Sequence, residues 1–395
     1  MLRSVKSFDL KGQTILMRLD LNVPINNGKI EDNFRLRSCL PTINYCLEQG
    51  ASIVIMSHLG RPEGQCNLNY SLIPVGESLA AMLEIPIKFS EDCISQDAID
   101  TSLSLKAGEV HLLENLRFYK QEQDNDPEFS NRLSRHGKLF INDAFGVAHR
   151  KHASNFGVVD NFKYYGIGLL VEKELRYLKD MTNKPKRPFV VLLGGAKVST
   201  KIELIKRYIY LADKIIIGGG MAFTFLKAMG YNIGKSLLEP TMVNNARSII
   251  DLARASGKEL ILPLDIICAK NIDEMPIKNA VDVRQISDNI MGLDIGPKSI
   301  KYFNEIINFA STVIWNGPMG VFENEAYSNG TRLIAENLSM IAENNVNVIA
   351  GGGDTSSALR HFNLVEKFTH VSTGGGSSMD LMSGNNLISI ERLEV

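Results

Sequence analysis

The first half of the chain carries basic and polar side chains suited to binding a small, strongly negative ligand. They occur at or near the ends of short apolar runs, as in RLDLNVP (18–24) and SHLGRP (57–62). A guanidinium group presents a planar fork of N–H donors that matches phosphate and carboxylate. One arginine in such a place is most simply a surface ion-pair partner, but five together favour an anion site. The five are Arg18, Arg35, Arg61, Arg117 and Arg150, accompanied by Asp20, Asn22, His58, His149 and His152.

The apolar runs of the second half end in glycines instead. Glycine has no side chain, so backbone N–H groups can approach a phosphate closely. A helix that begins directly after such a turn adds the positive end of its dipole. One glycine turn is most simply a tight connection between strand and helix, but five in one half indicate a polyphosphate site. The turns are Gly194–Gly195, Gly218–Gly220, Gly317, Gly351–Gly353 and Gly374–Gly376.

These residues need elements that hold them at one edge of a sheet. Ten short apolar runs alternate with longer stretches of helical periodicity, which is typical of parallel strands covered by helices on both faces. Ten runs are too many for one ordinary open sheet, so we predict an α/β protein with two doubly wound parallel-sheet domains. Ligands in such folds bind beyond the carboxyl ends of the strands. The runs are 14–20, 51–57, 109–115 and 139–145 in the first half, and 189–195, 214–220, 259–265, 311–317, 346–352 and 368–375 in the second.

A predicted helix separates the two sets of runs. Residues 166–182 place Val171, Leu175 and Leu178 on one stripe, and the proline-bearing segment NKPKRP (183–188) ends the helix. We expect this helix to act as a hinge element and the two ligands to meet in a cleft between the domains. An anion site in one domain and a nucleotide-like site in the other indicate phosphoryl transfer across that cleft.

The composition of the 395-residue chain is that of an ordinary globular protein with a formal net charge of −1. That balance provides no global field to recruit nucleic acid or a membrane, so we expect neither as a partner. The five cysteines are widely spaced and form no Cys-x-x-Cys pair, which fits a reducing compartment. The first residues lack the apolar core of a signal peptide, and no run reaches the roughly 18 apolar residues of a membrane helix. We expect a soluble, cytoplasmic protein.

Three motifs that suggest other functions are weak. GYNIGKS (230–236) has three residues between its glycines where a phosphate-binding loop has four, and no apolar strand runs into it. No G-x-G-x-x-G follows a strand, so a nicotinamide-dependent dehydrogenase is poorly supported. His149 and His152 are spaced to hold a metal, but the cations Arg150 and Lys151 between them favour contact with an anion.

Nine motifs in order along the chain resemble those of the phosphoglycerate kinase family. Each alone is modest evidence, but the ordered set runs from residue 18 to residue 378. Two segments near the end depart from the usual family pattern, GGGSSMD (374–380) and ISIERLEV (388–395). The nine motifs are RLDLNVP (18–24), SHLGRP (57–62), ENLRF (114–118), DAFGVAHR (143–150), GGAKVSTK (194–201), GGGMAFTFL (218–226), WNGPMGVFE (315–323), GGGDT (351–355) and STGGGSS (372–378).

The resemblance implies reversible phosphoryl transfer between 1,3-bisphosphoglycerate and ADP, giving 3-phosphoglycerate and ATP, a step of glycolysis. Mg²⁺ would accompany the nucleotide, and we expect a monomer. Residues 1–165 would form the phosphoglycerate-binding domain, 166–183 the linker helix and 184–376 the nucleotide-binding domain. The tail, 377–395, would pack back on the first domain.

The resemblance also implies roles for single residues. Asp354 would lie near the magnesium ion. Arg35, Lys197, Gly352 and Gly375 would act in catalysis. The residues implied to bind phosphoglycerate are Asp20, Asn22, Arg35, His58, Leu59, Gly60, Arg61, Arg117 and Arg150. Those implied to bind the nucleotide are Lys201, Gly219, Gly292, Asn316, Glu323, Gly352, Gly353, Asp354 and Thr355.

The chemistry of this reaction needs no general base. The acceptor is a carboxylate with a pKa near ~4, which is already ionised at neutral pH. Both reactants are anions, so catalysis must consist of positioning and charge neutralisation. Thr200 and Glu203 fit a helix-capping box, which predicts Lys197 in the loop and Lys201 in the first helical turn. We expect Lys197 to bind the transferred phosphoryl group and Lys201 the nucleotide phosphates.

Two other functions stay open at this point. A kinase for a different small acid would share the mechanism, although five arginines favour a substrate with its own phosphate. A non-catalytic scaffold could keep ligand sites, although Lys197, Asp354 and the glycine turns argue against it. ATP turnover assayed with 3-phosphoglycerate, acetate or carbamate distinguishes the three.

Overall fold

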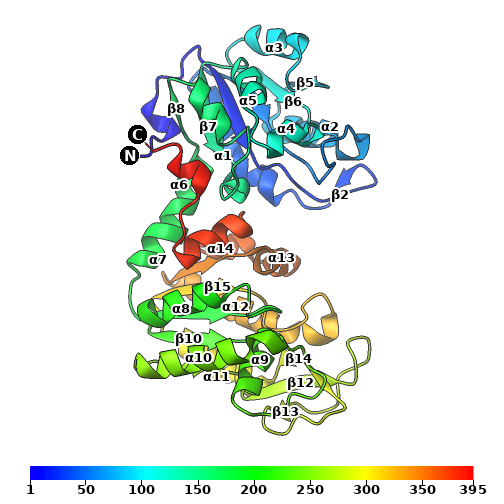
Figure 1. The fold of residues 1–395 in the computed structure, drawn as a ribbon, viewed down its shortest axis with the longest axis vertical. Helices are drawn as coiled ribbons and strands as arrows, with labels where there is room; N and C mark the ends of the chain where they lie inside the picture. Colours follow the sequence, from blue (N-terminus) through cyan, green and yellow to red (C-terminus); the bar gives the residue numbers. More distant parts are fainter. Residues whose placement is uncertain (395) are drawn as a thin grey trace. The chain divides into compact units, whose positions relative to one another are not determined.

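The computed structural model describes residues 1–394 of the chain. Contacts between residues divide it into two compact units. The first is Met1–Arg176 together with the segment from Asn385 onward, and the second is Tyr177–Gly384. Each is built around a six-stranded parallel sheet (Figure 1), so the predicted α/β class with two parallel-sheet domains is confirmed. No described helix has both the length and the apolar character needed to cross a membrane.

The first sheet has the strand order β5-β6-β4-β1-β7-β8. Its middle strands are buried along almost their whole length, because helices cover both faces of a parallel sheet. In register, Ile15 of β1 lies beside Ile53 of β4 on one side and Leu139 of β7 on the other. The strands are β1 (Thr14–Leu19), β4 (Ser52–Met56), β5 (Ile87–Ser90), β6 (Val110–Leu113), β7 (Leu139–Asp143) and β8 (Tyr165–Ile167).

Helices of the first unit begin and pack as their sequences dictate. In α5 the Asp126 side chain accepts a hydrogen bond from the Phe129 N–H, and Pro127 takes the first helical position, where its missing N–H costs nothing. Along α1, Leu36 and Ile43 face the core. The helices are α1 (Phe34–Glu48), α2 (Ile73–Leu83), α3 (Gln96–Leu103), α4 (Lys120–Gln123), α5 (Pro127–Ser134), α6 (Leu169–Leu175) and α15 (Ile388–Glu391).

The second sheet has the strand order β11-β10-β9-β15-β16-β17. The chain steps outward from β9 to β11 and then outward on the other side from β15 to β17. The order therefore reverses between β9 and β15, and open α/β sheets bind ligands beyond the carboxyl ends at such a point. The strands are β9 (Phe189–Leu193), β10 (Lys214–Ile217), β11 (Leu260–Ile261), β15 (Thr312–Asn316), β16 (Asn347–Ala350) and β17 (His370–Val371).

The helices of the second unit include two that start directly after glycine turns, α13 and α14. A small antiparallel sheet, β13-β12-β14, was not predicted. The last residue of the predicted run 259–265 belongs to this small sheet, because Asp265 pairs with Asp282 as the first residue of β12. The helices are α8 (Ile202–Leu211), α9 (Met221–Ala228), α10 (Val243–Ala255), α11 (Pro297–Ile307), α12 (Asn329–Glu343), α13 (Gly353–His361) and α14 (Gly376–Ser383), and the small sheet is β12 (Asp265–Ala269), β13 (Val281–Asp282) and β14 (Met291–Ile295).

The predicted helix 166–182 begins later than expected. Tyr165–Ile167 pair with β7 as strand β8, and Gly168 precedes the first helical residue. The helical stretch then runs through α6, a π-helical segment (Arg176–Asp180) and α7 (Met181–Asn183). The first unit ends inside it, at Arg176, rather than at residue 165.

The predicted tail, 377–395, is wrong in its first part. Residues up to Gly384 belong to the second unit, where α14 packs on α8 and Arg207 donates a 3.3 Å hydrogen bond to the Leu381 carbonyl. Gly384 ends α14 with a φ of 90°. From Asn385 the chain packs on the first unit. There Leu2 and Glu394 form an antiparallel bridge, so the two ends of the described chain lie side by side (Figure 1).

Candidate active site

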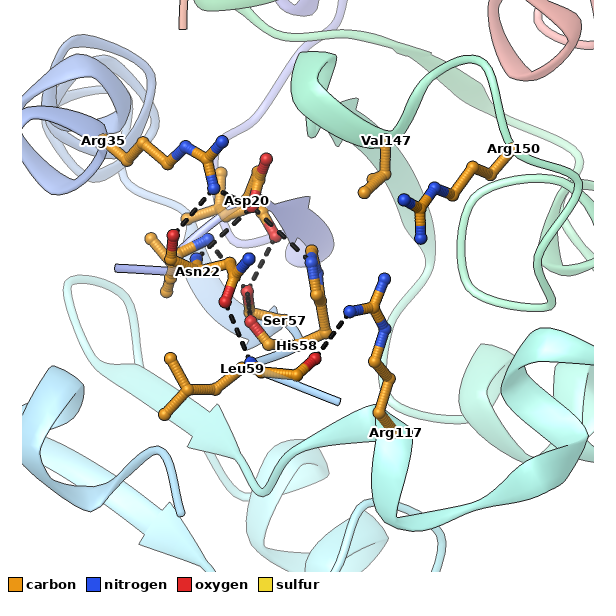
Figure 2. A network of polar contacts seen from close by, with 12 residues as sticks. Asp20, Asn22, Arg35, Ser57, His58, Leu59, Arg117, Val147 and Arg150 are labelled. Carbon is orange, nitrogen blue, oxygen red and sulfur yellow. Dashed lines mark hydrogen bonds and ion pairs between the residues drawn. The ribbon is translucent and has the colours of Figure 1, made fainter. Parts of the chain in front are cut away.

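Four neighbouring strands of the first sheet deliver one cluster of polar side chains at their carboxyl ends. Asp20 follows β1, His58 follows β4, Arg117 follows β6 and Arg150 follows β7. Because these four strands are adjacent in the order β6-β4-β1-β7, residues far apart in sequence come together (Figure 2). These four of the side chains predicted to bind an anion therefore lie in one cluster rather than scattered over the surface.

Arg35, Asp20 and Asn22 form one side of this cluster (Figure 2). The Arg35 Nη1 donates to the Asn22 carbonyl at 2.7 Å and lies 3.4 Å from Asp20 Oδ1. The Asn22 Oδ1 accepts a 2.9 Å hydrogen bond from the Gly60 N–H, which ties the loops after β1 and β4 together. A side chain at position 146 would come within 2.0 Å of Asp20 Oδ2, so Gly146 makes room for that carboxylate.

His58 lies at the centre of the basic residues. Its side chain is 2% exposed. Burial lowers its pKa well below the usual range, and the nearby charges of Arg18, Arg117, Arg35 and Arg150 lower that pKa further. The imidazole is therefore neutral at physiological pH, and four of the five predicted arginines surround it.

Arg117 and Arg150 form the other side of the cluster, and Figure 2 shows their guanidinium groups pointing toward one another. Arg117 donates to the Gly60 carbonyl at 2.6 Å, while its buried Nε has no hydrogen-bond partner. Burial and the charges of Arg150 and Arg18 lower the pKa of Arg117 to about 10. Arg150 Nε lies 3.2 Å from His149 Nε2, which accepts its hydrogen bond and is thereby occupied. Two cations held together around an unsatisfied donor fit an anionic ligand.

The two remaining predicted arginines differ from these. Arg18 is 1% exposed, and its guanidinium bonds Ser154 and His58 inside the protein, so the prediction that it contacts the ligand is not supported. Arg61 is exposed and makes no ion pair or hydrogen bond within the described residues. Its substrate-binding role stays a prediction. Leu59 and Gly60 contribute backbone to the cluster.

In the second unit the glycine turns surround a polar pocket of about 480 Å³. It lies beyond the carboxyl ends of β9 and β15, where the strand order reverses. Helices α13 and α14 both start at it, with Gly352 and Gly375 as their N-cap residues. The N–H groups of the first helical turns and the positive dipole ends of the two helices therefore face one space. Its lining includes Gly195, Lys197, Lys201, Asn316, Gly352, Gly353, Asp354, Thr355 and Gly375.

Lys201 and Asn316 form the buried floor of the polar pocket. The Lys201 Nζ donates to both the backbone carbonyl of Asn316, at 3.1 Å, and its side-chain Oδ1. Burial lowers the pKa of Lys201 to about 8, and the charge of Asp354 opposes this effect. Asn316 in turn donates to the Gly351 carbonyl at 2.8 Å.

The predicted capping box at the start of α8 is not formed. Lys201 is the N-cap residue rather than part of the first turn, and Thr200 donates its hydroxyl to the Lys197 carbonyl. Glu203 pairs with Lys206 instead of reaching back. Lys197 stands in the loop, as predicted, with an exposed side chain lining the polar pocket.

A second, more apolar pocket of about 280 Å³ adjoins the polar pocket and shares Gly195, Ala196 and Asp354 with it. Its walls suit a flat ring, because two glycines leave no room for side chains. A Cβ at Gly292 would lie 2.2 Å from the Phe223 ring, and one at Gly219 would lie 2.5 Å from a backbone nitrogen. The lining includes Gly219, Phe223, Gly292, Leu293, Pro318, Met319 and Glu323. Every residue predicted to bind nucleotide thus lines one of these two pockets.

Asp354 is the one predicted metal ligand. Its carboxylate is exposed and lies on the lining of both pockets. Within residues 1–394 no group of three or more His, Cys, Asp or Glu side chains is arranged to hold a metal. Magnesium commonly binds through one or two carboxylates plus substrate phosphates, so a single carboxylate fits an ion that arrives with a nucleotide.

Sequence reasoning missed residues whose importance comes only from folding. Phe223 and Leu293 belong to ordinary apolar runs until the fold places them in the apolar pocket. Glu122 and Ser154 belong to polar stretches typical of a surface, yet both are buried beside Arg18. Gly146 lies inside the motif DAFGVAHR, but the sequence does not show that its missing side chain makes room for the Asp20 carboxylate.

Known proteins resemble this chain along nearly its whole length. The family model of phosphoglycerate kinase matches residues 5–385. A phosphoglycerate kinase from Borrelia garinii is 45% identical over 394 residues, covering 100% of this chain and 99% of its own. One from Dictyoglomus turgidum is 46% identical over 388 residues, covering 98% and 96%.

Solved structures agree as well. The phosphoglycerate kinase of Coxiella burnetii superimposes with a TM-score of 0.89 at 36% identity, covering 100% of this chain and 99% of that one. That of Pyrococcus horikoshii gives a TM-score of 0.86 at 29% identity, covering 100% and 98%. The arginine cluster, the glycine pocket and these likenesses over the full length together place the chain in the phosphoglycerate kinase family.

Proposed function

We propose that this member of the phosphoglycerate kinase family binds its two substrates on separate units. The family reaction moves a phosphoryl group reversibly between 1,3-bisphosphoglycerate and ADP, giving 3-phosphoglycerate and ATP in glycolysis. The arginine cluster of the first unit takes phosphoglycerate, and the polar and apolar pockets of the second take the phosphates and base of the nucleotide. The observation that carries this division is chemical. The site in the first unit has cationic side chains, and the Nε of one of them, Arg117, has no hydrogen-bond partner among the described residues. The site in the second unit has backbone N–H groups beside the apolar pocket.

In the proposed mechanism the protein positions two anions and neutralises their charge. The substrate carboxylate is already ionised, so no residue has to remove a proton. The negative charge of the transferred phosphoryl group is neutralised from both units. Arg35 contributes from the first unit, and Lys197 contributes from the second together with the N–H groups at the starts of α13 and α14. Lys201 holds nucleotide phosphates from the pocket floor. Asp354 would hold a magnesium ion, which would add positive charge to help neutralise the nucleotide phosphates.

We further propose that the enzyme acts as a cytoplasmic monomer. A glycolytic reaction supports that location. The five cysteines are free, and four of them are buried, which suits a reducing compartment.

Separate calorimetric titrations with 3-phosphoglycerate and with magnesium–ATP test the division. Arg117→Lys keeps the charge but loses the planar fork and leaves the Gly60 carbonyl less well bonded. We expect phosphoglycerate affinity to fall about 10- to 100-fold, as for loss of charge-assisted hydrogen bonds. ATP affinity should stay unchanged.

Arg132→Lys is the matched control, because Arg132 is half-exposed and its guanidinium lies 3.9 Å from Glu128. It should alter neither titration. Equal weakening of both ligands in Arg117→Lys would contradict a divided site.

A further inference from the structure

Arg18 is buried at the base of the arginine cluster, and its N–H groups donate hydrogen bonds to groups inside the protein. Its Nε donates to Ser154 Oγ at 2.8 Å, and its Nη2 lies 3.0 Å from His58 Nδ1. Its third nitrogen, Nη1, donates to the Leu19 carbonyl. A guanidinium has donors and no acceptor. Each of these contacts therefore has a defined direction.

Glu122 completes the set from the other side of Ser154. Its carboxylate is fully buried and accepts from the Ser154 hydroxyl at 2.6 Å and from the Ser154 backbone N–H at 2.9 Å. Its Oε1 lies 3.9 Å from the Arg18 guanidinium. The Ser154 hydroxyl has one proton, which the short bond assigns to Glu122, so Ser154 Oγ is free to accept from Arg18.

The direction of these bonds fixes which ring nitrogen of His58 carries its proton. Arg18 cannot accept, so His58 Nδ1 must accept from Arg18 and must be unprotonated. The neutral ring then carries its proton on Nε2, the nitrogen that lies 3.8 Å from Asp20 Oδ1 on the side facing Arg35 (Figure 2). In the other tautomer, two donors would oppose each other across 3.0 Å.

The same carboxylate also holds the loop that carries Arg150. The Glu122 backbone carbonyl accepts from the Ala153 N–H at 2.8 Å, and its Oε1 lies 3.8 Å from His152 Nδ1. Residues 152–154 are thereby fixed from both the backbone and the side chain of Glu122. The chain between this anchor and the end of β7 contains Arg150.

We propose that Glu122, Ser154 and Arg18 form a buried positioning relay that holds His58 in the Nε2–H tautomer, so that it presents a hydrogen-bond donor to the phosphoglycerate carboxylate or phosphate. Glu122 and Ser154 are positioning residues, since neither touches the proposed ligand space. The arrangement gives a neutral imidazole a fixed donor direction without a proton taken from solvent. Its consequence for substrate rests on the proposed phosphoglycerate site.

The tautomer can be read directly by ¹⁵N NMR of histidine-labelled protein without any substrate. We expect His58 Nδ1 at the shift of an unprotonated nitrogen and Nε2 at that of a protonated one. In Ser154→Ala the relay loses its central oxygen, so the His58 signals should move toward a tautomer mixture. The KM for 3-phosphoglycerate should rise about five- to twenty-fold, as for a misdirected hydrogen bond, with the KM for ATP unchanged.

Ser130→Ala is the matched control. Ser130 is a buried serine whose hydroxyl, among residues 1–394, bonds the Asp126 and Ala153 carbonyls and none of Arg18, Glu122 and Ser154, so the His58 signals and both KM values should keep their native values. Glu122→Gln should move the His58 signals in the same direction as Ser154→Ala.

The native spectrum alone can overturn the proposal, even where a variant fails to fold. A protonated Nδ1 on His58 in the native protein would refute the relay, whatever the site binds. Native signals retained in a folded Ser154→Ala would refute it as well. By contrast, unaltered phosphoglycerate binding in Arg117→Lys, with the Nε2–H tautomer in place, would refute the proposed site and leave the relay standing.

Discussion

At the scale of single residues, the glycines around the polar pocket are of two kinds. Gly352 has a φ of 93°, and a Cβ there would lie 2.8 Å from Asn316 Nδ2, so the fold itself requires glycine. Gly375 has a φ of −74°, and a Cβ there would meet no atom within 4 Å. Packing and backbone conformation therefore give no reason for glycine at 375. The reason must lie in what occupies the open space, which fits a phosphate close to the backbone.

Alanine substitutions separate these two kinds. Gly375→Ala should leave the free energy of unfolding within about 0.5 kcal/mol of native, as for a substitution that touches nothing. Its kcat should fall, because the new methyl group stands where the transferred phosphoryl group is proposed to lie. Gly352→Ala should cost about 1–2 kcal/mol of stability in addition to lost activity, since alanine is strained at positive φ. Urea unfolding and steady-state kinetics measure the two quantities.

Gly108→Ala is the opposite control. Its φ is 86° with open space around it, and it lies in the first unit away from the arginine cluster. It should lower stability and leave kcat native. A Gly375→Ala protein with native kcat would show that no ligand uses that space.

At the scale of elements, the sequence predicted central strands and their carboxyl ends well. Long buried strands such as β4 and β9 can be recognised in the sequence as continuous apolar runs, because both faces of a central parallel strand are apolar. Edge strands such as β5 do not, since that strand is only partly buried. Glu122 lies in the stretch YKQEQDND, which is typical of a solvated surface. Only the tertiary contacts of Arg18 and Ser154 make it a buried anchor, so no local pattern could have revealed it.

One chain of hydrogen bonds fastens edge strand β5 and helix α3 to β6. His111 lies 2.8 Å from Ser90 Oγ and 2.8 Å from Ser102 Oγ, and Ser102 Oγ lies 2.7 Å from His136 Nδ1. His136 Nε2 donates to the Cys93 carbonyl at 3.1 Å. A carbonyl only accepts, so a neutral His136 must accept from Ser102, and the rest of the chain follows in one direction. Protonating His136 Nδ1 would break the hydrogen bond that it accepts from Ser102, whose hydroxyl would then have to turn to the Ala98 carbonyl at 3.0 Å.

This chain predicts a loss of stability in acid. Burial is the main cause that lowers the pKa of both His111 and His136 from 6.5 to about 4. Between these values the unfolded state binds more protons, so stability is complete above about pH 6.5 and declines as the pH falls toward 4. One such imidazole contributes up to about 3 kcal/mol. Urea unfolding at pH 7.5 and 4.5, followed by circular dichroism, measures the difference.

The double variant His111→Gln with His136→Gln tests the cause. It should be less stable than native at pH 7.5, because it loses hydrogen bonds, yet lose less stability between pH 7.5 and 4.5. His361→Gln, which alters an exposed imidazole, should keep the native difference. A double variant as acid-sensitive as the native protein would assign the acid loss to other groups.

At the scale of the whole molecule, the residues proposed to bind the two substrates lie on different compact units. The arginine cluster belongs to Met1–Arg176, and the glycine pocket to Tyr177–Gly384. The sequence allowed this division to be predicted because each set of motifs follows the strands of one half. The limits of the units were less predictable. Residues 377–384 pack with α8 through tertiary contacts that no local pattern contains.

Transfer requires the reacting oxygen and phosphorus to come within ~3–3.5 Å of each other, so substrates held by separate units must be brought together. In the proposed mechanism Arg35 and Lys197 act on one phosphoryl group, so without that anion like-charge repulsion would disfavour bringing these two cations together. Either ligand alone supplies anions to one unit only. Both together neutralise the two sets of cations and should shift the population to a compact form.

Small-angle scattering should therefore show a clear fall in the radius of gyration when 3-phosphoglycerate and a magnesium nucleotide are both saturating, and little change with either alone. Water must also be excluded at that stage, because an acyl phosphate and a metaphosphate-like transition state are both open to hydrolysis. Arg117→Lys supplies the control, since it should need more phosphoglycerate to reach the same compact form while keeping the same final radius. An unchanged radius in an active preparation saturated with both ligands would mean that the reacting groups are already assembled without closure, and the hinge account would then be wrong.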